Sequence, residues 1–257
     1  MFANERQFEI LSLLRADGTV SVADLAARFG VSIETVRRDL LHLEQAGHVQ
    51  RVHGGAVLPG KIIPISDLEH RVEENKSGKV ELCETAVTLV ENGDVIFVDS
   101  GATARYFAQT LKKRLRKLTV ITHCQDVFDI LQDCDGFELI LCGGHYMKKE
   151  RVFYGYLAQE SLKQLYADKA FFFASTVSLQ GGVCDFSKEL VSIQKQVMSQ
   201  CGNAYLLADS QKFERRGLYR LCGADSFRSI VTDSGLPQPL RRLYEEKGIH
   251  IMIGKES

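Results

Sequence analysis

The organisation of this chain follows from residues 20–55, VSVADLAARFGVSIETVRRDLLHLEQAGHVQRVHGG. Apolar residues at one-turn spacing predict a short helix over residues 21–29, which Gly30 ends. Ser32 stands at the N-cap position of a second helix. The predicted buried stripe of that second helix consists of Ile33, Val36, Leu40 and Leu43. The stretch therefore predicts two helices joined by a sharp turn.

The second helix leaves polar and cationic side chains facing outward from its first turns. These residues are Ser32, Glu34, Thr35, Arg37 and Arg38. A helix that buries one stripe and presents Ser, Thr and Arg suits the major groove of DNA. The alternative is an ordinary helical hairpin with a solvated polar face. Ala26, Gly30 and Val36 fall on the small, turn and core positions of a helix-turn-helix, which favours the DNA-binding interpretation.

The residues on either side complete a small domain. Residues 4–15 predict a preceding helix, with an inner stripe of Phe8, Leu11 and Leu14. After the second helix, residues 48–51 and 55–58 predict two short strands around Gly54-Gly55, which is a β-wing. Arg51 and His53 near its tip are candidates for phosphate or minor-groove contacts, and the alternative is that they are exposed loop residues.

Composition limits the function classes but does not itself indicate DNA binding. The 257 residues allow two domains, and 45% hydrophobic with 25% charged residues is typical of a globular protein. The net charge is −1, so the DNA argument depends on motif geometry. No signal-peptide pattern or membrane-length apolar run is present, and the seven cysteines form no Cys-x-x-Cys pair. We therefore expect a cytoplasmic protein without membrane association, metal site or cofactor.

The remaining sequence predicts a second domain. Residues 59–75 hold two of the four prolines and a charged half, which favours a linker between domains at 1–58 and 76–257. A helix is predicted over 76–91. Short apolar runs then alternate with helical patterns, which predicts an α/β domain with a mostly parallel sheet. The predicted strands are 95–98, 118–121, 138–141, 170–173, 204–207, 230–231 and 250–253.

Polar and glycine residues follow several of these strands. In open α/β sheets, ligands bind outside the carboxyl ends of the strands. The candidate effector-binding residues are Asp99, Ser100, Gly101, Ala102, Thr103, Thr122, His123, Gly143, Gly144, Glu189, Asp209 and Lys212. A turn of Ser, Gly and Thr that opens a helix suits a phosphate, and Lys212 would add positive charge. The alternatives are that the turn only caps its helix and that Lys212 is a solvated surface lysine.

The first sixty residues resemble the DeoR family of bacterial transcription regulators. The resemblance extends over Val22-x-x-Leu25-Ala26-x-x-Phe29-Gly30-Val31-Ser32-x-x-Thr35-Val36-Arg37-Arg38-Asp39-Leu40, Leu43-Glu44-x-x-Gly47 and His53-Gly54-Gly55-Ala56. It implies a winged helix-turn-helix in which Thr35, Arg37 and Arg38 face the groove.

Residues 76–253 resemble the sensor domain of the same family, which is similar in fold to ribose-5-phosphate isomerase and binds a phosphorylated sugar or related metabolite. The matching motifs are Asp99-Ser100-Gly101-Ala102-Thr103, Thr122-His123, Cys142-Gly143-Gly144, Asp168-x-Ala170-Phe171 and Asp209-Ser210-x-Lys212-Phe213. Three features depart from the family pattern. Ala102 replaces a second hydroxyl residue, His123 replaces a frequent Asn, and the strand continues as Phe172-Phe173-Ala174-Ser175 where the family favours a Gly.

These observations predict a transcription regulator, a repressor of carbohydrate-metabolism genes, without catalytic residues. Its partners would be double-stranded operator DNA, a small phosphorylated metabolite as effector, and further copies of itself in a dimer or tetramer. The alternative is a sugar-phosphate isomerase-like enzyme with an accessory DNA-binding domain, in which Asp99 and Glu189 act as bases and Lys212 as stabiliser. Thiol-based sensing has only the scattered cysteines in its favour.

Overall fold

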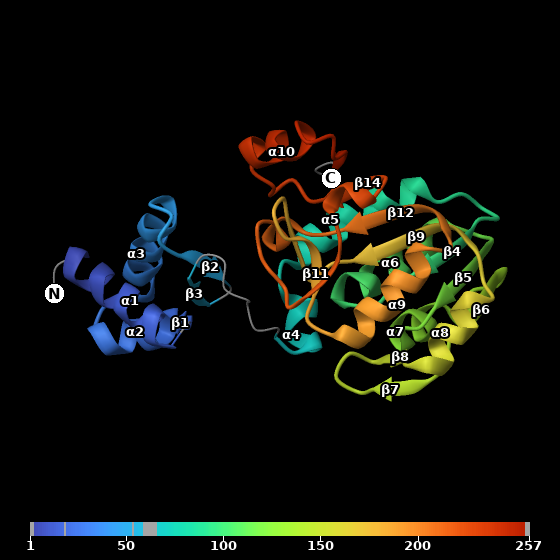
Figure 1. Ribbon diagram of the computed structural model, residues 1–257, viewed down its shortest axis with the longest axis horizontal. Helices are drawn as coiled ribbons and strands as arrows, with labels where there is room; N and C mark the ends of the chain where they lie inside the picture. The colour runs from blue at the N-terminus through green and yellow to red at the C-terminus, as the bar shows by residue number, and fades with distance from the viewer. Residues whose placement is uncertain (1–2, 18, 53, 59–65, 255–257) are drawn as a thin grey trace. The chain divides into compact units, whose positions relative to one another are not determined.

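The computed structural model describes all residues except 1–2, 18, 53, 59–65 and 255–257, and the chain divides into two compact units (Figure 1). Unit 1 spans Met1–Ile63 and unit 2 spans Pro64–Ser257. Each unit encloses hydrophobic core of its own. None of the helices within the described residues has the length and apolar character needed to cross a membrane.

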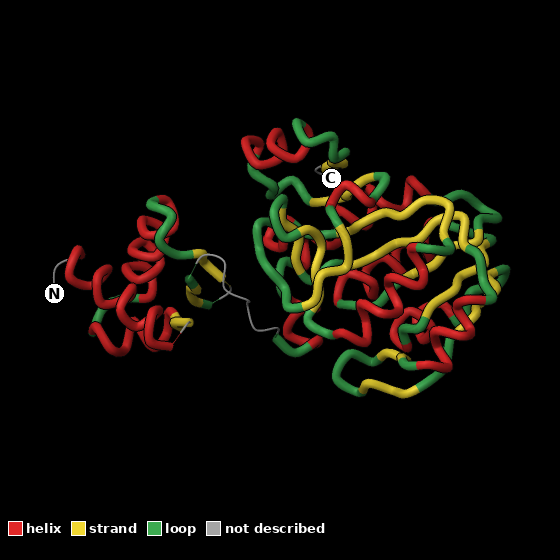
Figure 2. Tube along the Cα trace, viewed as in Figure 1, coloured by secondary structure: helices red, strands yellow, loops and turns green. Residues whose placement is uncertain are grey.

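Unit 1 combines three helices with a three-stranded antiparallel sheet (Figures 1 and 2). The helices are α1 (Ala3–Asp17), α2 (Val22–Phe29) and α3 (Ile33–Gln45). The strands, in the order β1-β3-β2, are β1 (Thr19–Ser21), β3 (Gly55–Val57) and β2 (Gln50–Val52). The winged helix-turn-helix predicted from the sequence is confirmed.

Serines cap the starts of α2 and α3, and a glycine makes the sharp turn between the two helices. The Ser21 hydroxyl accepts a hydrogen bond from the Asp24 N–H and starts α2. The Ser32 hydroxyl accepts one from the Thr35 N–H at 3.2 Å and starts α3. Gly30 ends α2 in the left-handed region, with a φ of 64°, which glycine adopts at no steric cost. Ser32 as N-cap and Gly30 as helix stop are therefore confirmed.

The core of unit 1 takes one stripe from each helix. It includes Ile10, Leu14, Leu25, Val36, Leu40 and Leu43. Two predictions about these stripes are wrong: the side chain of Phe8 is 74% exposed and that of Ile33 is 49% exposed. The buried face of α1 is set by Ile10 and Leu14 instead. Ile33 is the first residue of α3 and lies outside the stripe that begins at Val36.

The third strand of the wing, β1, was not predicted. Three residues are too few to show strand periodicity, and β1 is held by its antiparallel pairing with β3, in which Val20 lies opposite Ala56. A Cβ atom on Gly55 would lie 1.9 Å from the Val20 carbonyl oxygen. Glycine at position 55 is therefore needed for the two backbones to approach.

A buried ion pair joins α1 to α3. Arg6 donates to both carboxylate oxygens of Asp39, from Nε at 2.5 Å and from Nη2 at 3.1 Å. The hydrogen bond to Asp39 raises the pKa of the Arg6 guanidinium, although burial opposes it. Removing one partner of such a pair costs about 3–5 kcal/mol, because it leaves an uncompensated buried charge. Asp39 is thus a structural residue. Its negative charge is paired with Arg6 and does not neutralise the positive charges of Arg37 and Arg38 on the surface.

Unit 2 is built on a seven-stranded sheet in which all neighbouring strands run parallel. Each of the seven predicted strands is present in it, which confirms the predicted α/β class. The strands, in spatial order, are β15 (Ile251–Ile253), β14 (Ser229–Thr232), β12 (Cys201–Leu207), β9 (Ala167–Phe173), β4 (Val95–Val98), β5 (Leu118–Thr122) and β6 (Phe137–Leu141).

Helices cover both faces of this sheet (Figure 1). Side chains alternate along each strand, so Ile96 and Val98 contact one layer of helices and Phe97 contacts the other. The first layer holds α5 (Lys76–Ala86), α6 (Ala102–Arg114) and α7 (Gln125–Leu131). The second holds α8 (Tyr156–Lys163), α9 (Lys188–Met198) and α10 (Gln238–Glu245).

Several small elements were not predicted. A hairpin is formed by β7 (His145–Met147) and β8 (Val152–Tyr154). A second antiparallel sheet consists of β10 (Thr176–Ser178), β11 (Gly182–Asp185) and β13 (Tyr219–Cys222). Three 3₁₀ helices are η1 (Val87–Leu89), η2 (Ser210–Lys212) and η3 (Ala224–Ser226).

The stretch predicted as a linker is only partly described. Residues 59–65 lie outside the described residues, and α4 (Leu68–Glu73) occupies most of the remainder. Leu68 and Arg71 of α4 are buried, and α4 packs against α6. The domain boundaries at residues 58 and 76 remain predictions.

Candidate DNA-binding and effector sites

The outward face of α3 carries the residues predicted to read DNA. Ser32, Glu34, Arg37 and Arg38 are exposed and Thr35 is half-buried, while Val36 and Leu40 point into the core. Arg37 lies 3.7 Å from Glu34 in an exposed ion pair, which contributes little. No ionic partner for Arg38 is found among the described residues. α3 thus presents a cation at its surface although the chain is nearly neutral.

The wing supplies one more described candidate. Arg51 on β2 is exposed, and its Nε donates to Glu44 at 2.7 Å. The Arg51 backbone N–H also donates to Glu44, at 2.8 Å. The contact fixes β2 to the end of α3, so Arg51 is partly committed to a structural role. His53, the other candidate, lies outside the described residues.

The strand order of unit 2 identifies where a ligand would bind. From β4 the chain proceeds through β5 and β6 to one edge, and it then returns to β9 on the other side of β4. The carboxyl ends of β4 and β9 therefore form the topological switch point, the usual ligand position in such sheets. Asp99-Ser100-Gly101 follows β4 there, and a Cβ on Gly101 would lie 3.7 Å from the Cβ of Phe173 at the end of β9.

Asp99 lies at this switch point, fully buried and fully hydrogen-bonded. Its Oδ1 is 3.0 Å from Nε2 of His123, and its Oδ2 accepts a hydrogen bond from Nε2 of Gln194 at 2.9 Å. The other ring nitrogen of His123, Nδ1, lies 2.8 Å from the Phe153 carbonyl oxygen. Both nitrogens of His123 are engaged, so the ring holds Asp99 in place and has no free atom for a ligand.

Thr122 is committed in the same way. Its hydroxyl donates to the Val98 carbonyl at 2.8 Å and accepts from the Cys124 N–H at 3.0 Å. Three of the predicted effector residues thus form a buried hydrogen-bonded cluster at the sheet edge, called here the buried support: Asp99, Thr122 and His123. The departure from the family pattern at His123 therefore affects this support.

Asp185 and Gln194 belong to the same cluster, and neither was predicted from the sequence. Gln194 Nε2 also lies 3.4 Å from Oδ2 of Asp185, while Ser175 donates to Oδ1 at 3.1 Å. Burial raises the pKa of Asp185 to about 6; the Phe186 N–H opposes this and the charge of Asp99 adds to it. The available signal was that Gln194 stands on the buried face of α9 with Leu190, Ile193 and Val197.

The residues that follow Asp99, from Ser100 to Thr103, are not held by side-chain hydrogen bonds in the way that Asp99, Thr122 and His123 are. No side chain caps α6, whereas serines cap α2, α3 and α9. Neither the Ser100 nor the Thr103 hydroxyl has a hydrogen-bond partner among the described residues. Ala102, at the start of the helix, is buried. The first turn of α6 therefore combines uncapped N–H groups, two uncommitted hydroxyls and the positive helix end, an arrangement that suits an anion.

The remaining predicted residues lie on other loops. Asp209 is buried after β12, and Lys212, half-buried, ends the 3₁₀ helix that Asp209 caps. Gly143 is exposed after β6, and Gly144 packs against Tyr154 and α8. Glu189 is exposed in the first turn of α9, where its carboxylate accepts from Ser187. Glu189 is therefore exposed whereas Asp99 is buried, and no hydrogen bond joins the two among the described residues.

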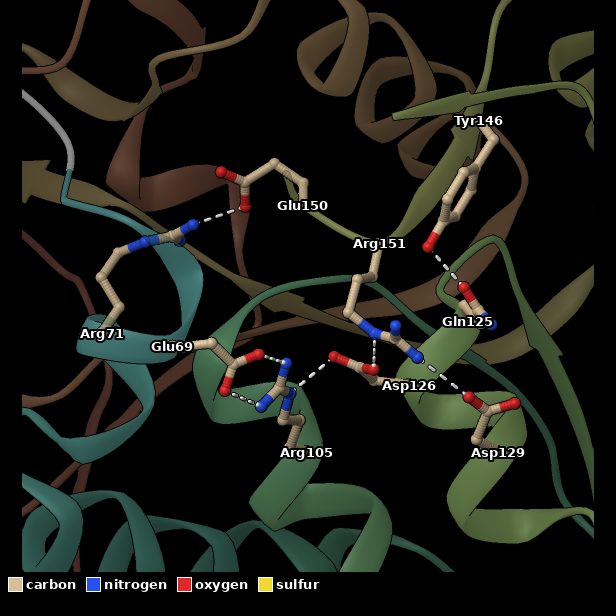
Figure 3. A network of polar contacts seen from close by, with 9 residues as sticks. All are labelled: Glu69, Arg71, Arg105, Gln125, Asp126, Asp129, Tyr146, Glu150 and Arg151. Atoms are coloured by element: carbon tan, nitrogen blue, oxygen red, sulfur yellow. Dashed lines mark hydrogen bonds and ion pairs between the residues drawn. The ribbon is translucent and has the colours of Figure 1, made fainter. Parts of the chain in front are cut away.

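A charged network connects α4 to the helices that start at the sheet edge (Figure 3). Arg105 of α6 donates to both oxygens of Glu69 on α4, at 2.7 and 2.9 Å, and to Asp126 of α7 at 2.5 Å. Arg151 contacts Asp126 and, at 3.0 Å, Asp129. Arg71 of α4 donates to Glu150 at 2.5 Å. An open groove of about 340 Å³ lies beside these residues, but every charge lining it is paired, so we assign it no ligand.

The cysteines do not support thiol sensing. All seven are free. Burial raises the pKa of Cys124 to about 12 and those of Cys142 and Cys222 to about 11, and it also raises that of Cys83. Since the thiolate is the reactive form, these thiols are unreactive near neutral pH.

The raised pKa of Asp185 predicts a pH-dependent stability. The pKa of Asp185 is about 6 in the folded state, whereas its ordinary value is 3.8. Asp185 therefore contributes to the free energy of unfolding below pH 4, and this contribution is lost as the pH rises through 6. Asp185→Asn, which cannot ionise, should gain stability relative to the wild type over this range, by at most about 3 kcal/mol at pH 7.5. Urea unfolding at pH 5–8 measures this difference. A difference that stays constant with pH would contradict the assignment.

Comparison with known proteins gives the family. The DeoR-like helix-turn-helix domain matches residues 6–61, and the DeoR C terminal sensor domain matches residues 74–234. The lactose phosphotransferase system repressor of Lactococcus lactis subsp. lactis is 32% identical, over 93% of this chain and 95% of that protein. The L-fucose operon activator of Haemophilus influenzae is 30% identical, over 97% and 100%. The transcriptional repressor AccR of Agrobacterium fabrum is 29% identical, over 93% and 96%.

A solved structure shows a remote likeness. Ribose 5-phosphate isomerase A from Methanocaldococcus jannaschii aligns with a TM-score of 0.42 and 20% identity, over 55% of each chain. A likeness of this size carries no argument about activity. The two domain matches cover most of the sequence in the expected order. The chain belongs to the DeoR family of transcription regulators.

Proposed function

We propose that this protein is a repressor of carbohydrate-metabolism genes whose operator affinity is controlled by a phosphorylated sugar or related metabolite bound in unit 2. The proposal rests chiefly on α3, which buries one stripe and presents an unpaired Arg38 beside Ser32, Thr35 and Arg37. Two of the relatives named above are repressors and one is an activator, and we therefore propose repression of transcription.

The support for an anionic effector comes from the start of α6. Its uncapped N-terminus and the free hydroxyls of Ser100 and Thr103 match the oxygens of a phosphate. The supporting cluster around Asp99 fixes this turn from below, since Asp99 immediately precedes Ser100. Sugar hydroxyls would donate to acceptors at the same sheet edge.

Control of DNA binding requires a connection from this turn to the segment that leads to unit 1. Arg105 lies one turn into α6 and binds Glu69 of α4, the first helix after residues 59–65. A ligand that moves the start of α6 would thereby alter the position of α4. We place the coupling in this contact, and such coupling is worth about 1–3 kcal/mol in known regulators.

A homo-oligomer, a dimer or tetramer, is part of the proposal. One helix-turn-helix makes few base contacts, and pairing of two copies on repeated half-sites supplies the missing affinity. Operator DNA, the effector and a second copy are then the three partners of each chain.

Loss of Arg38 should weaken DNA binding. Arg38→Ala is expected to lower the affinity for a duplex selected from a random library by about 1–3 kcal/mol, roughly 5- to 150-fold, if Arg38 reads a base. Fluorescence anisotropy at fixed moderate salt measures this, with Arg37→Ala in parallel. Lys113→Ala, which removes an exposed cation of unit 2, is the control and should bind as the wild type does. Unchanged affinity of both α3 variants would place the recognition surface elsewhere.

Lys212 should be required for effector binding. In a thermal-shift screen of phosphorylated sugars, a binding compound raises the melting temperature by mass action. Lys212→Ala should lose most of that rise, whereas Lys247→Ala at the exposed end of α10 should keep it. Lys212 is a better probe than Asp99, because Asp99 is buried and replacing it would disturb the fold. A full shift in Lys212→Ala would exclude this lysine from the site.

A further inference from the structure

The strand β6 forms one edge of the seven-stranded sheet and pairs with β5 alone. Just past its end, the Cys142 N–H donates to the Thr122 carbonyl at 2.8 Å. Because successive N–H groups along a strand point to opposite sides, those of Leu139 and Leu141 point away from β5. No backbone acceptor for these two N–H groups is found among the described residues. The outer side of β6 is therefore an open edge.

This edge lacks the features that usually keep an edge strand unpaired. Natural edge strands carry charges, prolines or covering segments, because their free N–H and C=O groups otherwise pair with another strand. Of the five residues of β6, only Glu138 is charged, and the other four are apolar and half-buried. The strand is thus suited to pairing with a second strand.

Exposed apolar side chains lie close to this edge. The loop after β6 leads into the β7-β8 hairpin, and its Gly144 packs against β8 and α8. β8 in turn contacts α8 (Figure 1). Three large apolar side chains on these elements are exposed: Tyr146 at 43%, Tyr156 at 71% and Leu157 at 63%. Tyrosine is enriched at protein interfaces, so these residues extend the edge into a larger candidate interface.

Charges of opposite sign lie at the two ends of β6. The exposed carboxylates of Asp133, Asp135 and Glu138 lie before the strand and at its start. Exposed Lys148 and Lys149 lie beyond its carboxyl end, at the tip of the β7-β8 hairpin. None of these five side chains forms an ion pair within the described part of the chain. The edge is therefore acidic at one end and basic at the other.

We propose that the β6 edge is a self-association surface of unit 2, at which two copies of this chain pair their β6 strands antiparallel about a two-fold axis. The inference rests on the proposed function, because it assigns a surface to the homo-oligomer proposed there. A two-fold axis brings the same patch of both copies together and makes two copies of one edge strand run antiparallel. The acidic end of each edge then meets the basic end of the other copy. This self-complementary order of charges selects a second copy as the partner.

The strand pair needs the neighbouring side chains to form a stable interface. Specific complexes bury about 1,200–2,000 Å² in total, and two strands of five residues supply only part of such an area. Tyr146, Tyr156 and Leu157 supply further apolar area. The charges at the two ends contribute orientation and association rate more than affinity. Strand pairing therefore sets the register, and the apolar side chains add affinity.

Charge reversal at the two ends tests this arrangement. One variant carries Asp133→Lys with Asp135→Lys, and a second carries Lys148→Glu with Lys149→Glu; all four side chains are exposed, so the fold should persist. Each variant alone should self-associate with a Kd about tenfold or more above that of the wild type, because like charges then face each other. An equimolar mixture of the two should recover wild-type association, because opposite charges meet again at both ends. Analytical ultracentrifugation of the full chain at moderate salt measures this.

The matched control is Arg242→Glu with Lys247→Glu. Both cations are exposed, on α10 and just after it, and α10 packs against β15 at the opposite edge of the sheet. This control should associate as the wild type does. A mixture of the two charge-reversed variants that associates no better than its components would overturn the proposal.

Hydrogen exchange tests the strand pairing itself. The Leu139 and Leu141 N–H groups should be protected in the wild-type oligomer and exchange faster in either charge-reversed variant, because pairing gives them acceptors. Equal exchange of these groups in the associated wild type and in the dissociated variants would exclude β6 from the interface.

The inference and the proposed function fail in different ways. If the wild type associates and both charge-reversed variants associate as tightly, only the β6 surface is wrong. If the wild type stays monomeric with and without a selected DNA duplex, the homo-oligomer of the proposed function is wrong and the inference falls with it. If the variants lose association but keep wild-type DNA affinity, the β6 surface stands and the role of pairing in DNA binding is wrong.

Discussion

The hydrogen bonds to Asp99 fix the part of unit 2 on which the candidate site depends. His123 from the loop after β5 and Gln194 from α9 hold its two oxygens, so the sheet edge and the α9 layer are joined at one buried carboxylate. Asp185 extends the same cluster into the small antiparallel sheet. The Ser100–Thr103 turn begins directly after Asp99, so the hydrogen bonds of Asp99 fix the position at which this turn starts. An anion-binding turn needs such preorganisation, because mobile donors lose entropy on binding.

In the proposed function, the coupling to DNA runs through the ion pairs of α6, the helix that follows this turn. Arg105 in α6 and Asp126 in α7 each belong to a helix that starts at the sheet edge, and the ion pairs of Figure 3 join both to α4. Glu69 is 75% exposed, so its ion pair with Arg105 can rearrange at small cost in free energy. A regulator needs two such arrangements with different ligand affinities, since a ligand that binds both equally shifts nothing.

Most of the fold could be predicted from the sequence because its signals are local. The caps at Ser32 and Gly30, the stripe through Val36 and Leu40, and the apolar strands between polar tails depend on neighbouring residues only. Phe8 and Ile33 were misplaced because a helical stripe does not reveal which of two adjacent faces the tertiary contacts cover. The site residues Asp185 and Gln194 belong to no motif. Gln194 nevertheless left one signal, a long polar residue on the buried face of a helix.

The proposed regulation requires that a ligand at the Ser100–Thr103 turn changes the affinity of the protein for DNA. The most direct measurement is the Kd for a selected duplex, by fluorescence anisotropy, with and without a saturating sugar phosphate that stabilises the protein. The account predicts a change of roughly 5- to 150-fold. It also predicts that DNA changes the affinity for the sugar phosphate by the same factor, as linkage requires. Equal DNA affinity with and without a ligand that demonstrably occupies unit 2 would contradict the account.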